Sequence, residues 1–384
     1  MTPHQESTQQ GQVSQTEFHE LLREKLRAAV RYTLIEVLDA EVEAYIGAAA
    51  YQRVPGRQDY RNGHYQRNLV TGMGQVEGLP VPRTRHGFKT QVFAQYQRRQ
   101  ADLDEAICAM FVSGGSTAQV GQIVEKLTRT KPSPSTVSRV FHGLEDEFGS
   151  WKKRRLAPEY LYVFADGTYF SVIYGTEGHK MPILAIIGIT VDGQREVLAF
   201  RVGERENQLA WEDVLDDLKE RGVEKVDLWI TDGNPAMINA IKLKFPHSAR
   251  QRCVKHKMDN VLGYIPKKQQ AQVRPELKAI FYQQNRQKAD QEVAAFIEKY
   301  KPIYPTAIDC LQRDLDACLT FYDFPKEHWK TIRTTNVIER LFLEVKKRSH
   351  KMAAPFRNED SCLLMFYAVI RGIKFRRIPI SAKN

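Results

Sequence analysis

The sequence has few cysteines and no long apolar run, and both absences narrow the classes of protein to which it can belong. Its five cysteines, at positions 108, 253, 310, 318 and 362, are odd in number and form no CxxC pair. Scattered thiols of this kind make no disulfide framework and are typical of a reducing compartment. No apolar stretch is long enough to span a bilayer, and no N-terminal segment has the pattern of a secretory signal. We therefore expect a soluble cytoplasmic protein with no membrane partner.

Several motifs of well-known enzyme classes are also missing. The chain has no GxxxxGK[ST] phosphate loop, no HExxH zinc helix and no GxSxG nucleophile elbow. The HxxR pair of His64 with Arg67 comes too early for a tyrosine recombinase, which needs such a cluster before a late tyrosine. Cys253 and His256 form a Cys-x-x-His pair, but no second pair at a suitable spacing completes four zinc ligands. A structural role for this pair is the simpler interpretation.

Positive charge is in excess. Lysine and arginine number 57 against 46 acidic residues, which gives a net charge of +11 and a pI near 9.3. Such a balance favours a polyanionic partner such as nucleic acid, although a solvated basic surface would give the same numbers. At 384 residues and 44.2 kDa the chain is long enough for several folded units with at least one sizeable core.

The N-terminal part divides into a polar segment and a helix. Residues 1–14 have almost nothing to bury, which predicts a disordered leader. From residue 15 to about residue 50, apolar residues recur every three or four positions, as on one face of a helix. They are Phe18, Leu21, Leu22, Leu26, Val30, Leu34, Val37, Leu38 and Val42. The surface that covers this stripe is either another part of the same chain or a second subunit, so dimerisation through the helix is one hypothesis.

Residues 51–100 predict a small basic module rich in β-structure. Turn signals such as Asn62-Gly63 separate short alternating runs. Arginines and tyrosines alternate through the segment, a density expected where side chains meet phosphates. We single out Arg83 and Arg85 as candidate DNA contacts, with a solvated basic loop as a nearly equal alternative.

Residues 101–150 predict three short helices. Ser116 with Gln119 makes a capping box, and Ser133 is an N-cap before Pro134 at the first helical position. A glycine turn after the first helix and a short polar link before the third are typical of a helix-turn-helix. The third helix would then present to DNA Ser135, Thr136, Ser138 and Arg139. Many trihelical cores bind no DNA, so a purely structural bundle stays open.

The remainder predicts an α/β domain that is interrupted by helices. Residues 151–257 contain the strand-like runs YLYVFA, YFSVIYG, MPILAIIGITV and EVLAFRVG, followed by strand–helix alternation, which indicates a mixed sheet. Residues 258–330 are helical throughout and look like an insertion. Residues 331–384 belong again to the α/β domain and predict two helices, from about residue 336 to 350 and from about residue 360 to 376. These helices should close the core of that domain.

Three acidic residues are the candidate chemistry of this domain. Asp166 follows the run YLYVFA, Asp232 follows VDLWIT at the carboxyl end of a strand, and Glu339 opens a helix. Mg²⁺ prefers carboxylate ligands, and two such ions roughly 3.5–4 Å apart can support in-line displacement at phosphorus. A fourth acid, Asp192, sits with Gly193 between two apolar runs and is assigned to a hairpin turn.

Each of the three acids also has a structural explanation. Asp166 with Gly167 fits a hairpin turn, and Asp232 fits the cap of the following helix. Glu339 lies three residues after Asn336 and fits a variant of the capping box. Taken one at a time, none of them establishes a site.

Taken in order, the motifs resemble the Mutator-type transposases of bacterial insertion sequences. DGTYF resembles the first-aspartate motif of that family, and TDGNPAMINAI followed by FPHSARQRCVKHK resembles the second, with its trailing Cys-x-x-His. RTTNVIERLFLEVKKRS resembles the glutamate motif, in which Asn336 precedes Glu339. Upstream, YRNGHYQR and VPRTRHG resemble the amino-terminal DNA-binding region of the family.

The resemblance implies a ribonuclease H-like catalytic domain with an all-helical insertion and a DDE triad of Asp166, Asp232 and Glu339. It implies Mg²⁺, for which Mn²⁺ can substitute in such enzymes, and DNA as partner: the terminal inverted repeats of an insertion sequence and a target. The activity would be strand cleavage and strand transfer by a homodimer or larger assembly in the bacterial cytoplasm, at the nucleoid when bound to DNA.

The helix that carries Glu339 ends in a basic run. Its cations would neutralise phosphates beside the metal ions, unless they are only a solvated helix end. They are Arg340, Lys346, Lys347 and Arg348. Two other functions stay open at this point: a domesticated DNA-binding regulator that does not cut, and a ribonuclease H-like nuclease that cuts but does not join.

Overall fold

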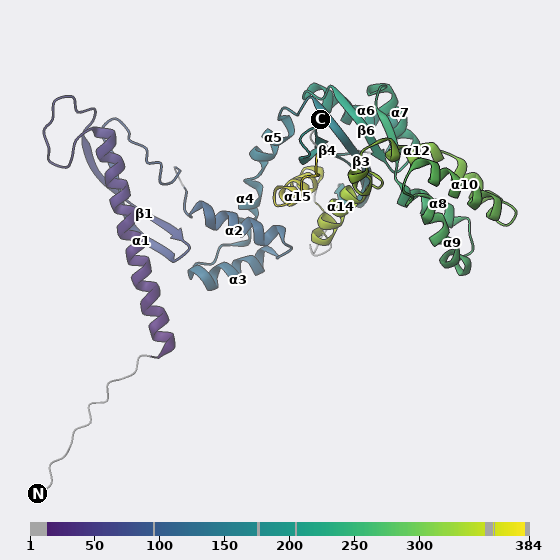
Figure 1. Cartoon of the computed structure of the whole chain (residues 1–384). Coiled ribbons are helices and arrows are strands. Elements are labelled where there is room, and N and C mark those ends of the chain that lie inside the picture. Colours follow the sequence, from purple (N-terminus) through teal and green to yellow (C-terminus); the bar gives the residue numbers. More distant parts are fainter. Residues whose placement is uncertain are drawn as a thin grey trace, which may run out of the picture. The chain divides into compact units, whose positions relative to one another are not determined.

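The computed structural model describes residues 14–94, 97–174, 177–203, 206–349, 356 and 358–380. The predicted leader, apart from its last residue, and the final four residues lie outside this range. The chain divides into two compact units, Met1–Gly143 and Leu144–Asn384. Figure 1 labels the elements of both units, which are described separately below.

The first unit begins with a long helix on a β-hairpin. Helix α1 (Gln15–Ile46) confirms the predicted helix, and it starts with a capping box in which the Ser14 side chain accepts a hydrogen bond from the Glu17 amide. Strands β1 (Arg61–Thr71) and β2 (Gly74–Thr84) pair antiparallel. The C-terminal part of α1 supplies Leu38 to a core with Leu69 and Leu79 of the hairpin. A surface within the chain therefore covers this part of the stripe.

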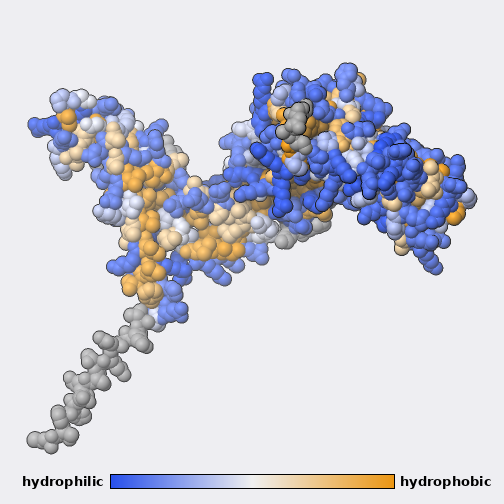
Figure 2. All heavy atoms as spheres, viewed as in Figure 1, coloured by the Kyte–Doolittle hydropathy of each residue, from blue (hydrophilic) through white to orange (hydrophobic). Residues whose placement is uncertain are grey.

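The N-terminal half of α1 leaves its apolar side chains open to solvent. Phe18, Leu21, Leu22 and Leu26 are all exposed. Figure 2 shows the hydrophobic residues along this helix.

Three helices complete the first unit: α2 (Ala101–Val112), α3 (Thr117–Thr128) and α4 (Pro134–His142). Both predicted caps are confirmed, since Ser116 accepts from the Gln119 amide and Ser133 from the Thr136 amide. The three helices share one small core. It contains Leu103, Ile107, Val120, Val124 and Val137.

The second unit is built on a mixed five-stranded sheet in the order β5-β4-β3-β6-β7. β3, β4 and β5 pair antiparallel, whereas β6 and β7 run parallel to β3. The strands are β3 (Glu159–Tyr174), β4 (Glu177–Thr190), β5 (Arg195–Val202), β6 (Lys225–Thr231) and β7 (Ala249–Arg252).

The hairpin-turn alternative for Asp166 is wrong. The runs YLYVFA and YFSVIYG both belong to β3, which passes through the Asp-Gly step without a turn. Asp166 pairs with Ala185 of β4 and Gly167 with Leu184. Pairing with β4 along the whole length of β3 outweighs the local turn preference of Asp-Gly. Asp192 and Gly193, by contrast, form the predicted turn between β4 and β5.

Helices cover both faces of the sheet (Figure 1). α6 (Gln208–Glu220) and α7 (Pro235–Lys244) pack on one face, where Trp229 of β6 is fully buried with Trp211 of α6. α14 (Asn336–Ser349) and α15 (Glu359–Arg371) lie against β3, β4 and β5. Ring contacts join Phe366 of α15 to Phe170 of β3 and Phe200 of β5. α5 (Glu145–Lys153) packs beside α15.

The segment between β7 and α14 is helical throughout, as predicted. It contains α8 (Val254–Gly263), α9 (Lys267–Ile280), α10 (Arg286–Tyr300), α11 (Pro305–Gln312), α12 (Leu315–Leu319), η1 (Thr320–Asp323), η2 (Lys326–His328) and α13 (Trp329–Ile332). No helix in the described ranges is long and apolar enough to cross a membrane. All five cysteines are free thiols.

Candidate active site

The register of two parallel strands brings Asp166 and Asp232 together. The last paired residues of β3 and β6 are Phe164 and Ile230. Asp166 comes two residues after Phe164 and is still within β3. Asp232 comes two residues after Ile230 and lies directly after β6. Because side chains alternate along a strand with a period of two, both carboxylates share a face and an edge of the sheet.

Local hydrogen bonds fix the two carboxylates. Asp166 Oδ1 accepts from the Gly167 amide at 2.8 Å, and Asp232 Oδ1 accepts from the Asn234 amide at 2.9 Å. The residue that caps α7 is Asn234, whose side chain accepts from the Ala236 amide. The alternative interpretation of Asp232 as the helix cap is therefore wrong.

Asp166 is a buried acid in an acidic neighbourhood. Only 7 % of its surface is exposed. Burial, the nearby Asp232 and, more weakly, Glu339 raise its pKa from 3.8 to about 7, against the opposing effects of His256 and the Gly167 amide. A buried carboxylate beside like charges is stable only when a proton or a cation neutralises it.

Glu339 lies in the first turn of α14, the helix that packs on β3. Asn336 is the first residue of that helix, and the Glu339 amide donates to Thr335 O at 3.2 Å. The capping-box interpretation is therefore wrong for Glu339. Its carboxylate instead forms an ion pair with Lys255 Nζ through Oε2, and Oε1 lies 3.6 Å from His256 Nε2.

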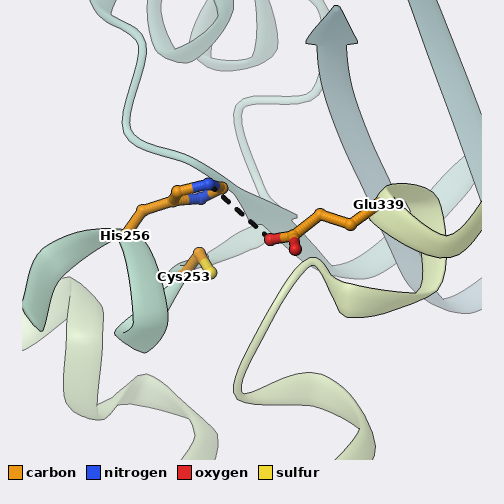
Figure 3. Close-up of side chains that lie close together, drawn as sticks. All are labelled: Cys253, His256 and Glu339. Carbon is orange, nitrogen blue, oxygen red and sulfur yellow. Dashed lines mark ion pairs between the residues drawn. The ribbon is translucent and has the colours of Figure 1, made fainter. Parts of the chain in front are cut away.

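Cys253 and His256 lie beside Glu339 (Figure 3). One ligand atom from each of the three residues falls within 4.8 Å of the others, and the described residues contain no other such group of three. Cys253 is fully buried between β7 and α8, where its Sγ accepts from the Thr335 amide at 3.4 Å. Burial opposes ionisation of the thiol, but interaction with the nearby His256 lowers the Cys253 pKa, and the same interaction raises the His256 pKa to about 9.

Sequence reasoning missed Glu206. Its Oε1 accepts from Asn234 Nδ2 at 2.9 Å, and a Cβ added to Gly167 would lie only 2.8 Å from the same oxygen. Burial and the nearby Asp232 raise its pKa. Glu206 therefore lies between the segments that carry the two aspartates. The available signal was its place between the end of β5 and the start of α6, the kind of strand end at which Asp232 was recognised.

The basic residues of α14 have different partners. Lys346 Nζ donates to Thr168 Oγ1 at 2.7 Å, two residues along β3 from Asp166. Lys347 and Arg348 form ion pairs with Glu344 on their own helix. Arg340 is exposed. Of the four predicted phosphate contacts, Lys346 is thus the one held against the strand of the site.

In the first unit, the predicted DNA contacts lie in two places, at the end of β2 and on α4. Arg83 stacks on Tyr65 and Arg85 on Tyr60, with 4.9 and 5.3 Å from guanidinium to ring centre. On α4, Ser135 and Arg139 are exposed, Ser138 is half-buried, and the Thr136 hydroxyl lies 3.0 Å from that of Ser133.

A hollow of about 1070 Å³ lies beside the hairpin of the first unit. Cationic and aromatic side chains line it, among them Arg67, Arg83, Lys89, Arg98, Tyr65, Phe88 and Phe93.

Comparison with known proteins gives a consistent result. Residues 1–376 match the family described as "Transposase, Mutator family". The chain is 33 % identical over 345 residues to the transposase for insertion sequence element ISRM5 of Rhizobium meliloti, covering 90 % of this chain and 86 % of the relative. It is 31 % identical over 356 residues to the transposase for IS905 of Lactococcus lactis, covering 92 % and 90 %.

The transposase for IS256 in transposon Tn4001 of Staphylococcus aureus is 33 % identical over 352 residues, covering 91 % of this chain and 90 % of the relative. The match extends over both units, including the strand that carries Asp166, the strand that Asp232 follows and the helix that carries Glu339. The chain belongs to the Mutator family of transposases.

Proposed function

We propose that the chain binds the terminal inverted repeats of its insertion sequence and cleaves and joins DNA at a DDE triad of Asp166, Asp232 and Glu339. The observation that carries this proposal is the aligned register of β3 and β6, which sets the two aspartates on one sheet edge, while the helix of Glu339 packs on β3. The mixed sheet with helices on both faces supports a ribonuclease H-like fold for the second unit.

The donor set fits a hard divalent cation. Asp166 is buried, carries a raised pKa and has Asp232 and Glu206 for neighbours, so the site favours an added positive charge. Asp166, Asp232 and Glu339 would hold Mg²⁺, or Mn²⁺ in its place. When bound, such ions polarise the scissile phosphate and help to activate the attacking oxygen. Lys346, held against β3 at Thr168, would contribute positive charge toward DNA phosphates.

Recognition of the DNA ends is assigned to the first unit. The three-helix core, in which α3 and α4 are capped, supports a helix-turn-helix in which α4 contacts base edges through Ser135, Ser138 and Arg139. Arg83 and Arg85 of the hairpin module would contact phosphates, with Tyr65 and Tyr60 orienting their guanidinium groups. Joining needs two ends at once, so we propose that the active species is a dimer or a larger assembly.

Arg139→Ala tests the assignment of α4. If Arg139 contacts a base, its loss should weaken binding to the cognate end by about 10-fold and leave binding to random duplex nearly unchanged. Lys126→Ala, which removes an exposed charge from α3, is the matched control. Fluorescence anisotropy with both duplexes at fixed salt measures the two affinities. An equal loss on cognate and random DNA would make Arg139 a phosphate contact.

Glu206→Gln tests the fourth carboxylate. Loss of a negative charge beside Asp232 should weaken cation binding, so the Mg²⁺ concentration for half-maximal cleavage is expected to rise about 3- to 10-fold. The amide can still accept the hydrogen bond from Asn234, so local structure should survive. Glu220→Gln, an exposed position at the end of α6, is the control. An unchanged Mg²⁺ requirement would limit Glu206 to a structural role.

The direct test of the function is an assay of strand products. Purified protein is incubated with labelled duplexes that carry the element's ends, together with a supercoiled target, in Mg²⁺, in Mn²⁺ or in chelator. Metal-dependent nicks at the tips and joined products would support the proposal. Tight end binding without cuts would favour the regulator, and cuts without joined products would favour the nuclease.

A further inference from the structure

Cys253, His256 and Glu339 meet from separate elements at one point. Cys253 ends the turn after β7, and His256 follows in the first turn of α8, where a spacing of three places both on one side of the helix start. Glu339 comes from α14. Figure 3 shows the thiol, the imidazole and the carboxylate converging on the same space.

The spacing of these groups suits ligands of one metal ion better than a hydrogen-bonded cluster. His256 Nε2 and Glu339 Oε1 are 3.6 Å apart, and their contact is an ion pair without a hydrogen bond. Nitrogen and oxygen ligands at about 2.0–2.2 Å from a tetrahedral Zn²⁺ are separated by roughly 3.4 Å. Small side-chain movements would bring the three ligand atoms, now within 4.8 Å of one another, to such distances.

One buried polar atom at this point also has no hydrogen-bond partner. Glu339 Oε1 is shielded from solvent and makes no hydrogen bond with the part of the chain that the structure describes. Unpaired buried polar atoms are costly and rare. The other carboxylate oxygen of Glu339 is held by Lys255, so a cation at Oε1 would leave that ion pair in place.

We propose that Cys253, His256 and Glu339 form a binding site for a thiophilic divalent cation such as Zn²⁺, with a fourth position open to water. Thiolate and imidazole ligands select Zn²⁺ over Mg²⁺, whereas Asp166 and Asp232 offer only oxygen, which Mg²⁺ prefers. The cluster of Cys253 and His256 therefore selects a different metal from the pair of Asp166 and Asp232. Glu339 can be a ligand in either place.

Zn²⁺ at this site has one consequence for activity, which rests on the proposed function. Glu339 would be held by Zn²⁺ together with Cys253 and His256, and would then be withdrawn from the Mg²⁺ ligands. Zn²⁺ should therefore inhibit Mg²⁺-dependent cleavage at least tenfold in the wild type. The metal site itself does not depend on cleavage.

Co²⁺ is the probe for the metal site, because it replaces Zn²⁺ and reports thiolate ligation in its absorption spectrum. Titration of the full, metal-free chain should give a sulfur-to-cobalt charge-transfer band and the intense visible bands of a tetrahedral ion, saturating at one equivalent. Zn²⁺ should abolish these bands, and excess Mg²⁺ should not. Asp166→Asn should keep them, because Asp166 is not a ligand of this site.

Cys253→Ser should remove the charge-transfer band, and Cys310→Ser is the matched control among the free thiols. His256→Gln serves as a second variant if Cys253→Ser does not fold, as judged by circular dichroism. No band in the wild type, or a band that survives both variants, would overturn the site. If the site exists but Zn²⁺ inhibits wild type and Cys253→Ser equally, the link to Glu339 is wrong. Absence of cleavage with an intact cobalt spectrum would count against the DDE assignment alone.

Discussion

Asp166→Asn, Asp232→Asn and Glu339→Gln are each expected to lower the rate of end cleavage by on the order of a thousandfold or more, because residues that act as one metal-binding unit fail together. Each change keeps the size of the side chain and removes the charge that Mg²⁺ needs. Single-turnover cleavage of a labelled end duplex measures the loss. Pairs of these changes should cost little more than one of them.

The control for this series is another Asp-Gly aspartate. Asp192 lies in the turn between β4 and β5, where its carboxylate accepts from the Thr190 hydroxyl, and it pairs with Arg377. Asp192→Asn removes the same charge from the same domain and should leave cleavage within about twofold, as a surface substitution does. All four variants should bind the end duplex like the wild type. Cleavage retained in one triad variant would exclude that residue from the site.

The local signals in the sequence predicted the helices well and one strand poorly. Ser116, Ser133 and the apolar stripe of α1 act within a few residues, and the structure confirms the helices they predict. Asp166-Gly167 carries a strong turn preference, yet β4 pairs with β3 through it residue by residue. Pairing with a distant strand is not visible in a window around Asp166, so local preference gave the wrong answer there.

The candidate site was also predictable only in part: local patterns marked its acidic residues, but their placement depends on contacts between distant parts of the chain. Apolar runs and a helix start marked Asp166, Asp232 and Glu339 as candidates, and the resemblance of the ordered motifs to the Mutator family joined them into one set. Their mutual placement depends on the parallel register of β3 and β6, which no local pattern specifies. Glu206 contacts Asn234, and Lys255 contacts Glu339. In both pairs the two residues are far apart in the sequence. Only the fold reveals such contacts.

The stability of the metal-free protein should depend on pH through Asp166. Its pKa is about 7 in the folded chain against an ordinary value of 3.8, chiefly because of burial and Asp232. The folded state thus binds a proton more tightly than the unfolded state does. The stabilising contribution is fully present below pH 3.8 and is lost as the pH rises to about 7. Above that pH the protein must keep a buried charge beside Asp232.

Asp166→Asn should therefore be more stable than the wild type at pH 8 in chelator, by about 2 kcal/mol, or a Tm higher by roughly 4 to 8 °C. At pH 5 the two proteins should unfold at more similar temperatures, since the wild-type carboxyl is then protonated. Differential scanning calorimetry from pH 5 to pH 8.5 gives the comparison, with Asp192→Asn as control.

Mg²⁺ should reverse the order of stability. A cation that binds only the folded wild type adds about 2.7 kcal/mol at a concentration one hundred times its Kd, and the neutral asparagine forfeits that gain. A wild type that is as stable as Asp166→Asn at pH 8 without metal would show that the Asp166 charge is not costly. The free-energy cost of the buried Asp166 charge is the physical reason why the site needs a cation, so without that cost Asp166 and Asp232 would have no need of Mg²⁺.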